Sequence, residues 1–174
     1  MLLLMVGLLS LLQAPWVYAG DEERKLEAVF IGRFASYIDW PDKDRERERF
    51  VITLLDDNPF GKLLDDLYRD KRIHNKPIEL RYANKLEQVG ETDVLFITLR
   101  NAAARLAATE FAHKNGILTI SEAKGFAESG GIIQLDFVEQ KTRIKINHAA
   151  AVKSGLKIGA PLLSIATVLR GDKP

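Results

Sequence analysis

The stretch FVITLLDDNPFGKLLDDL, residues 50–67, decides the fold, because it joins a buried strand to a helix. Residues 50–55 are apolar except for Thr53, which is typical of a strand covered on both faces. Asn58 and Pro59 are residue types favoured at the N-cap and in the first turn, so they predict the start of a helix. The apolar face of that helix is supplied by Phe60, Leu63, Leu64 and Leu67.

The same alternation of strand and helix continues along the chain. Pro77–Tyr82 is predicted to form a short strand, and the apolar runs Val94–Thr98 and Ile117–Ile120 two more. The alanine-rich segment Asn101–Lys114 lies between the last two and predicts a helix that ends at Asn115-Gly116. Strands that alternate with helices favour an α/β fold with a largely parallel sheet.

The C-terminal third has a different pattern. After Gly130-Gly131, apolar and polar residues alternate over 133–137 and again over 143–146, which predicts an antiparallel hairpin with one face on the core. Asn147 is expected to cap a helix over 149–154, and a last helix is expected over 161–169. The fold class predicted is therefore α/β: a three-layer sandwich with a largely parallel central sheet flanked by helices and a C-terminal antiparallel hairpin.

The N-terminus indicates export. Residues 1–19 contain no charged side chain, and Leu2–Leu12 is almost wholly apolar. Val17 and Ala19 are small residues at the positions that signal peptidase prefers, so cleavage is expected after Ala19. The prediction is a signal peptide over 1–19 and a single periplasmic domain over 20–174; the alternative is an uncleaved anchor.

The composition excludes several classes of function. The chain carries 25 Lys and Arg against 24 Asp and Glu, a net charge of +1, so no basic field for nucleic acid is expected. It has no cysteine, which excludes disulfides and thiolate metal sites. His74, His113 and His148 are far apart, and no set of catalytic side chains is apparent. No cofactor, metal or catalytic residue is predicted, and the protein is expected not to be an enzyme.

The first helix is the candidate surface for a protein partner. Its apolar residues recur at three- and four-residue steps from Leu26 until Pro41 stops the helix, and they cover more than one stripe. Phe34, Tyr37 and Trp40 are each three apart, so all three are expected on one side of this helix or its exit. Aromatic side chains often anchor interfaces, which makes these residues the predicted partner contacts. The alternative is that they only close the core.

A small-ligand site is the second hypothesis. Asp56 and Asp57 follow a buried strand, and Thr98 ends a later one. Open α/β sheets bind ligands beyond the carboxyl ends of their strands, so these three residues are the candidate ligand-binding residues. The competing interpretation is that Asp57 or Asn58 caps the helix that follows.

Several segments together resemble one protein family. They are FASYIDWP at 34–41, GGII at 130–133, RIKIN at 143–147, Ala149-Ala150, GLKI at 155–158, Leu162-Leu163 and Ile165-Ala166. Their order along about residues 25–170 resembles that of the YfiR family.

This resemblance implies a periplasmic regulator in c-di-GMP signalling. YfiR-like proteins repress an inner-membrane diguanylate cyclase by binding its periplasmic domain, and an outer-membrane lipoprotein sequesters the repressor. The expected partners are therefore such a membrane signalling protein and such a lipoprotein, with a homodimer left open. The best-described members carry disulfides, whereas this chain has no cysteine, so redox sensing is not implied for it.

Overall fold

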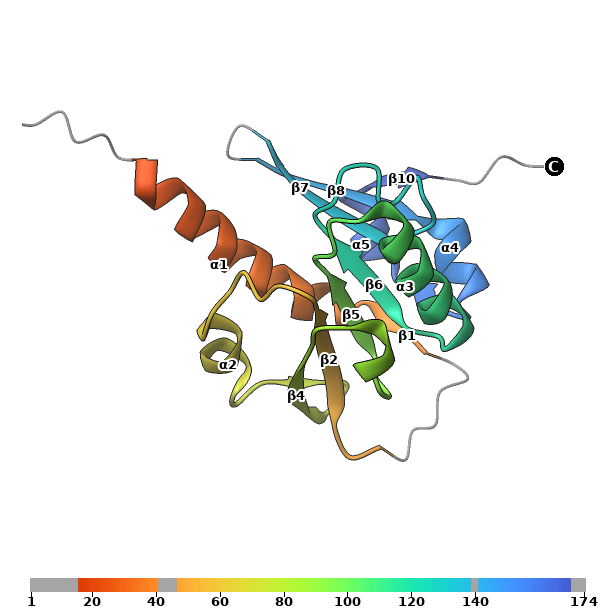
Figure 1. Cartoon of the computed structure of the whole chain (residues 1–174), viewed down its shortest axis with the longest axis horizontal. Coiled ribbons are helices and arrows are strands. Elements are labelled where there is room, and N and C mark those ends of the chain that lie inside the picture. The colour runs from red at the N-terminus through yellow and green to blue at the C-terminus, as the bar shows by residue number, and fades with distance from the viewer. Residues whose placement is uncertain (1–15, 41–46, 139–140, 170–174) are drawn as a thin grey trace, which may run out of the picture.

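The computed structural model describes residues 16–40, 47–138 and 141–169, and Figure 1 shows their arrangement. Most of the predicted signal peptide, residues 1–15, therefore lies outside the described residues. The elements in chain order are α1 Trp16–Ala35, β1 Ile38–Asp39, β2 Phe50–Leu55, α2 Leu63–Tyr68, β3 Arg72–Ile73, β4 Lys76–Ala83, η1 Leu86–Gln88, β5 Val94–Ile97, α3 Ala102–Lys114, β6 Leu118–Ser121, β7 Ile133–Val138, β8 Lys141–Asn147, α4 His148–Lys153, β9 Lys157–Ile158, α5 Ala160–Ser164 and β10 Thr167–Leu169.

An eight-stranded sheet organises the molecule, with the order β10-β8-β7-β6-β5-β2-β4-β3. The strands from β4 through β2, β5 and β6 to β7 run parallel to their neighbours. Strands β7 and β8 form the antiparallel hairpin predicted from the alternating pattern. The predicted class, a largely parallel α/β sheet with a C-terminal hairpin, is confirmed.

Helices cover both faces of this sheet, because the strands bury alternate side chains on opposite sides. On one face, Ile52 and Leu54 of β2 pack in a cluster with Phe34 of α1 and with residues of α2, α4 and α5. On the other face, Leu55 packs in a second cluster with Ala108 of α3. Figure 1 shows α1 running diagonally out from the sheet, with α3 on the opposite side of the strands.

The first helix ends earlier than its apolar period predicted. Helix α1 stops at Ala35, and the Tyr37 amide donates to the Phe34 carbonyl oxygen at 2.9 Å in a turn. Ile38 and Asp39 then form β1, which pairs antiparallel with β9. In the sequence, the three- and four-residue spacing of apolar residues continues through Ile38. In the structure, the backbone of Ile38 pairs instead with β9, a strand distant in the chain.

Two other helix boundaries also differ. Helix α2 begins at Leu63, not at Asn58, because Gly61 adopts a φ of +56° that breaks the helical path. The Asn58 side chain instead holds the preceding turn by accepting from the Phe60 amide at 3.0 Å. The helix predicted over 161–169 divides into α5 and the strand β10, because β10 finds a parallel partner in β8.

Candidate functional site

The strand order creates a crevice at one edge of the sheet. The chain passes from β2 to β4 on one side of β2 and then returns to β5 on its other side. The loops that follow β2 and β5 therefore leave in opposite directions, and ligands of open α/β sheets bind at such a point. The residues predicted for ligand binding, Asp56, Asp57 and Thr98, follow these two strands.

The structure brings together only part of this trio. The Thr98 hydroxyl lies 2.9 Å from the carbonyl oxygens of both Leu55 and Asp57, so it ties the two loops together through the backbone. Asp56 has a φ of 84°, a left-handed conformation that is uncommon outside glycine. Both aspartates are exposed, and the Asp57 carboxylate lies 3.9 Å from the Arg100 guanidinium. Thr98 thus acts as a structural tie between the loops.

A cavity of about 250 Å³ lies beside Thr98, between the ends of β5 and β6. Its walls are fixed by side chains that donate to backbone carbonyl oxygens: Arg105 Nη1 to Leu99 at 2.8 Å, and the Ser121 hydroxyl to Ile97 at 2.6 Å. It is lined by Ile97, Thr98, Leu99, Arg100, Arg105, Ser121, Glu122 and Ala123. The polar groups of this crevice are thus mainly those after β5 and β6.

The amino half of α1 lies against the same edge. Arg24 Nη1 donates to Glu122, just after β6, at 2.9 Å and also to Glu27 one turn along α1. The Arg24 guanidinium also lies 5.7 Å from the centre of the Phe60 ring, in the loop after β2. One arginine therefore links the helix to the loops after two parallel strands.

Glu27 is the buried member of this network. Its side chain is 0% exposed, and its Oε1 atom has no hydrogen-bond partner among the described residues. Burial and the neighbouring charge of Glu122 raise the pKa of Glu27 to about 8, while Arg24 acts in the opposite direction. Burial thus favours the protonated form of Glu27, which carries no charge for Arg24 to balance.

The stability of the protein is expected to fall as the pH rises towards 8. The folded pKa of Glu27 lies above its ordinary value of 4.5, so the folded state binds the proton more tightly than the unfolded state. The resulting stability is fully present below about pH 4.5 and is lost as the pH rises through about 8. Thermal melts of Glu27→Gln and of the wild-type protein should agree near pH 5, and the variant should melt higher at pH 9.

Glu22→Gln is the matched control for this experiment. Glu22 lies on the same helix, but it is exposed and pairs with Lys25 at 2.8 Å. The Glu22→Gln variant should show the same change in melting temperature between pH 5 and pH 9 as the wild-type protein. A wild-type melting temperature that responds to pH in the same way as that of Glu27→Gln would contradict the assignment to Glu27.

The three aromatic residues predicted for partner binding do not share a helix face. Phe34 is 1% exposed and stacks on Phe30 at 5.3 Å between ring centroids. Tyr37 lies in the turn after α1, and Trp40 lies beyond β1; both are half-buried. Because α1 ends at Ala35, Tyr37 and Trp40 lie at the exit of the helix and not on its face, and their contact with a partner stays a prediction.

Trp40 contacts the opposite, amino edge of the sheet. Its indole N–H donates to the Gly116 carbonyl oxygen at 3.1 Å, just before β6. Its ring makes edge contacts with Phe50 at 5.5 Å and with His74 at 5.8 Å between centroids. Trp40 therefore joins the first residue of β2 to the segments that precede β4 and β6.

The histidines have local structural contacts. His74 lies in the β3–β4 turn with a φ of 49°, and its Nε2 is 3.2 Å from the Ala35 carbonyl oxygen. His113 contacts the Gly130 carbonyl oxygen at 2.9 Å, and His148 is the first residue of α4. Among residues 16–40, 47–138 and 141–169, no group of three or more metal-ligating side chains is found.

Two features of α1 were missed in the sequence. Glu27 interrupts the buried stripe that contains Ile31 and Phe34, and an acidic residue at such a position was the available signal. The Tyr68 hydroxyl of α2 accepts from the Gly32 amide at 2.7 Å and donates to the Ala28 carbonyl oxygen. No local pattern could have found this second contact, because 36 residues separate its partners.

The outward face of α1 carries exposed apolar side chains. Leu26 is 42% exposed and Val29 is 43% exposed. The two residues are three apart and lie on one side of the helix. We call Leu26 and Val29 the outer α1 pair.

Comparisons with known proteins agree with this fold. A family profile described as YfiR/HmsC-like matches residues 24–167. A solved structure described as a conserved domain protein from Vibrio cholerae O1 biovar El Tor is similar, with a TM-score of 0.57 and 16% identity. The match covers 84% of this chain and 60% of that one, so this chain spans less than two thirds of its length. A search of curated proteins gives no match.

In the part of the chain that the structure describes, no helix is both long enough and apolar enough to cross a lipid bilayer.

Proposed function

Because the chain belongs to the YfiR/HmsC-like family, we propose that it represses an inner-membrane signalling protein, a diguanylate cyclase, by binding the periplasmic domain of that protein. Family members are in general periplasmic regulators of c-di-GMP signalling. The observation that carries the proposal is the family match, which extends over residues 24–167 and so includes nearly the whole described chain. The protein acts in this proposal as a binding partner, not as a catalyst.

The outer α1 pair is the proposed contact surface. Leu26 and Val29 are apolar and more than two-fifths exposed, and such side chains gain most from burial against a partner. Of the aromatic residues first considered, Tyr37 and Trp40 remain candidates as half-buried neighbours of the core. Phe34 is excluded from direct contact by its 1% exposure. An outer-membrane lipoprotein that competes for the same surface is a second proposed partner.

Substitution of the outer α1 pair should abolish repression without unfolding the protein. Leu26→Asp with Val29→Asp places charges where the partner's apolar surface is proposed to lie, while both residues are more than two-fifths exposed and lie outside the buried core. The melting temperature should remain close to the wild-type value. Co-purification with the cyclase's periplasmic domain should be lost, and cellular c-di-GMP should rise to the level of a deletion strain.

Leu106→Asp provides a matched control for the pair. Leu106 is 49% exposed but lies on α3, on the other side of the sheet. This variant should bind and repress as the wild type does. If the α1 variant is folded and still represses, the proposed contact surface is wrong.

Export with cleavage after Ala19 is part of the same proposal. Helix α1 extends from Trp16 to Ala35, so the cut would leave its larger part, from Gly20 onward, on the mature protein. Arg24, which links α1 to the sheet edge, lies on the mature side of the cut. N-terminal sequencing of the periplasmic fraction should begin at Gly20, whereas a protein that starts at Met1 in the membrane fraction would contradict cleavage.

A small-ligand binder is the second candidate, and the crevice at the carboxyl edge favours it. The cavity there of about 250 Å³ includes Thr98 of the predicted trio. It is smaller than most drug-sized ligand sites, which start near about 300 Å³. Asp56 and Asp57 are not among its lining residues, so in this proposal their contribution is confined to the neighbouring loop.

A further inference from the structure

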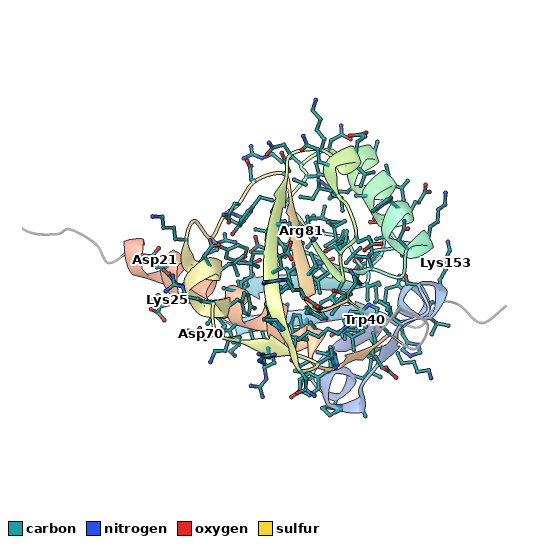
Figure 2. All side chains as sticks on the ribbon, turned by 90° about the horizontal axis from the view of Figure 1, so that it is seen from below. Asp21, Lys25, Trp40, Asp70, Arg81 and Lys153 are labelled. Atoms are coloured by element: carbon teal, nitrogen blue, oxygen red, sulfur yellow. The ribbon has the colours of Figure 1, made fainter. Side chains whose placement is uncertain are left out.

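Strand β4 has an outer edge that is largely unpaired among the described residues. On its inner side it pairs with β2 from Ile78 to Ala83. On its outer side β3 pairs with it only at Lys76 and Pro77. In Figure 2, β4 crosses in front of β2 and carries the labelled Arg81. The segment from Glu79 to Tyr82 is the open β4 edge.

The backbone groups that face outward can be identified from the register. The turn His74-Asn75 joins β3 to β4, and its closing pair is Ile73 with Lys76. In a hairpin with a two-residue turn, this pair exchanges hydrogen bonds, so the Lys76 backbone faces β3. Every second residue of a strand presents its backbone to the same side. Ile78, Leu80 and Tyr82 therefore present their N–H and C=O groups on the open side.

The inward-facing residues agree with this assignment. Ala83 is offset from Lys76 by an odd number of positions, so its backbone should face β2. Its carbonyl oxygen accepts from the Asp56 amide, which directly follows β2, at 2.8 Å. Because Arg72 lies opposite Pro77, Lys71 lies opposite Ile78 and occupies its outer side. The open β4 edge thus offers the unpaired N–H and C=O groups of Leu80 and Tyr82 within the described structure.

A cavity accompanies this edge on the α2 side. It has a volume of about 270 Å³ and is lined by Asp65, Tyr68, Arg69, Ile78 and Leu80. Ile78 and Leu80 point to the same side as Phe50 and Ile52, their partners in β2. A strand added to the open β4 edge would place alternate side chains on this same side.

The opposite side of the edge is charged. Arg81 Nε donates to Glu79 Oε1 at 2.6 Å, and both residues lie on the side away from α2. Because oppositely charged residues stabilise cross-strand pairs, a strand added there fits best with an acidic residue opposite Arg81 and a basic residue opposite Glu79.

A second copy of this chain is poorly suited to the position. Antiparallel self-pairing centred on Leu80 is the register that sets Glu79 against Arg81, whereas the adjacent registers oppose like charges. In the centred register, Ala83 of the copy would lie opposite Pro77, a place that Arg72 of β3 already occupies. Ala83 is held against Leu55 of β2 and cannot turn aside. A strand that covers only Glu79 to Tyr82, and ends or bends before Lys71, avoids this clash.

We propose that the open β4 edge binds an extended segment of a partner polypeptide, which adds an antiparallel strand opposite Glu79–Tyr82. The segment has the pattern apolar–acidic–apolar–basic, and its apolar residues face the cavity between α2 and β4. Main-chain hydrogen bonds supply the affinity and the alternate side chains supply the specificity. This surface is separate from the outer α1 pair, so the inference does not depend on the proposed repression.

The probe is a capped peptide, Val-Glu-Leu-Lys with flanking Gly-Ser pairs, added to the mature full-length protein. Hydrogen exchange at the Leu80 and Tyr82 amides should slow in its presence, while exchange at Leu26 and Val29 stays unchanged. The same peptide, N-methylated at the amides that face β4, should bind at least about tenfold more weakly, since each lost bond costs about 1 kcal/mol or more. A peptide with its apolar and charged positions exchanged should also lose binding.

Two protein variants test the same contact. Leu80→Pro removes one outward N–H at an edge position where proline is tolerated, and should weaken peptide binding. Leu80→Ala keeps that N–H and serves as its matched control. If Leu80→Pro does not fold, the N-methylated peptide tests the same hydrogen bonds with the protein unchanged.

The proposal is overturned by any of three results: no binding of the peptide at millimolar concentration, binding that leaves both amides unprotected, or protection of these amides in a concentration-dependent dimer without peptide. The last result would assign the edge to a second copy. Repression in cells is not a readout here, so failure of this inference is distinct from failure of the proposed function.

Discussion

Phe34→Ala is expected to lower the free energy of unfolding by about 3–5 kcal/mol, the range for phenylalanine truncated in a packed core. Phe34 is 1% exposed, belongs to the larger core cluster and stacks on Phe30 at 5.3 Å. Removal of the ring leaves a cavity that helix α1 and the sheet cannot fill without moving. Chemical denaturation monitored by tryptophan fluorescence measures the loss.

Trp40→Ala separates the two interpretations of the aromatic residues. Trp40 is half-buried, so its loss should cost less than that of Phe34, about 3 kcal/mol, and should include the indole hydrogen bond to Gly116. If Trp40 only closes the core, partner binding of both variants should recover under conditions where they are folded. A Trp40→Ala protein with an unchanged melting temperature and no partner binding would instead support the interface role first predicted for this residue.

Gly32→Ala is expected to lower the free energy of unfolding by about 2 kcal/mol, although alanine is the better helix former by about 1 kcal/mol. A Cβ at Gly32 would lie 2.7 Å from both the Cε1 atom and the hydroxyl of Tyr68. Tyr68 would have to withdraw, and its buried hydroxyl would lose the Gly32 amide and the Ala28 carbonyl oxygen. Thermal and denaturant melts give the change.

The sign of this effect should reverse when Tyr68 is shortened. In a Tyr68→Leu background the ring atoms that block the Cβ are absent, so Gly32→Ala should stabilise the protein by about 0.5–1 kcal/mol through helix propensity alone. The double-mutant cycle therefore isolates the contact between α1 and α2. If Gly32→Ala has the same effect in both backgrounds, Tyr68 is not the reason for glycine at this position.

The candidate sites could be predicted from the sequence to different degrees. The crevice could be located in advance, because the ends of buried strands such as Phe50–Leu55 mark the ligand edge of a parallel sheet. Its composition could not, since Arg24, Glu122 and Thr98 come from three distant segments. The open β4 edge also had no sequence signal, because a strand's place in the sheet order is set by all of its neighbours.

The sequence by itself determined the α/β class, the hairpin of β7 and β8, and the Asn147 cap of α4, since these follow from the period of apolar residues and from local hydrogen bonds. It also carried the family resemblance. Only the tertiary structure decided that α1 ends at Ala35, that residues 167–169 form β10, and that Glu27 is buried beside Glu122. In each of these cases a segment distant in the chain supplies the hydrogen bonds, the burial or the charge, and its contribution outweighs the local preference.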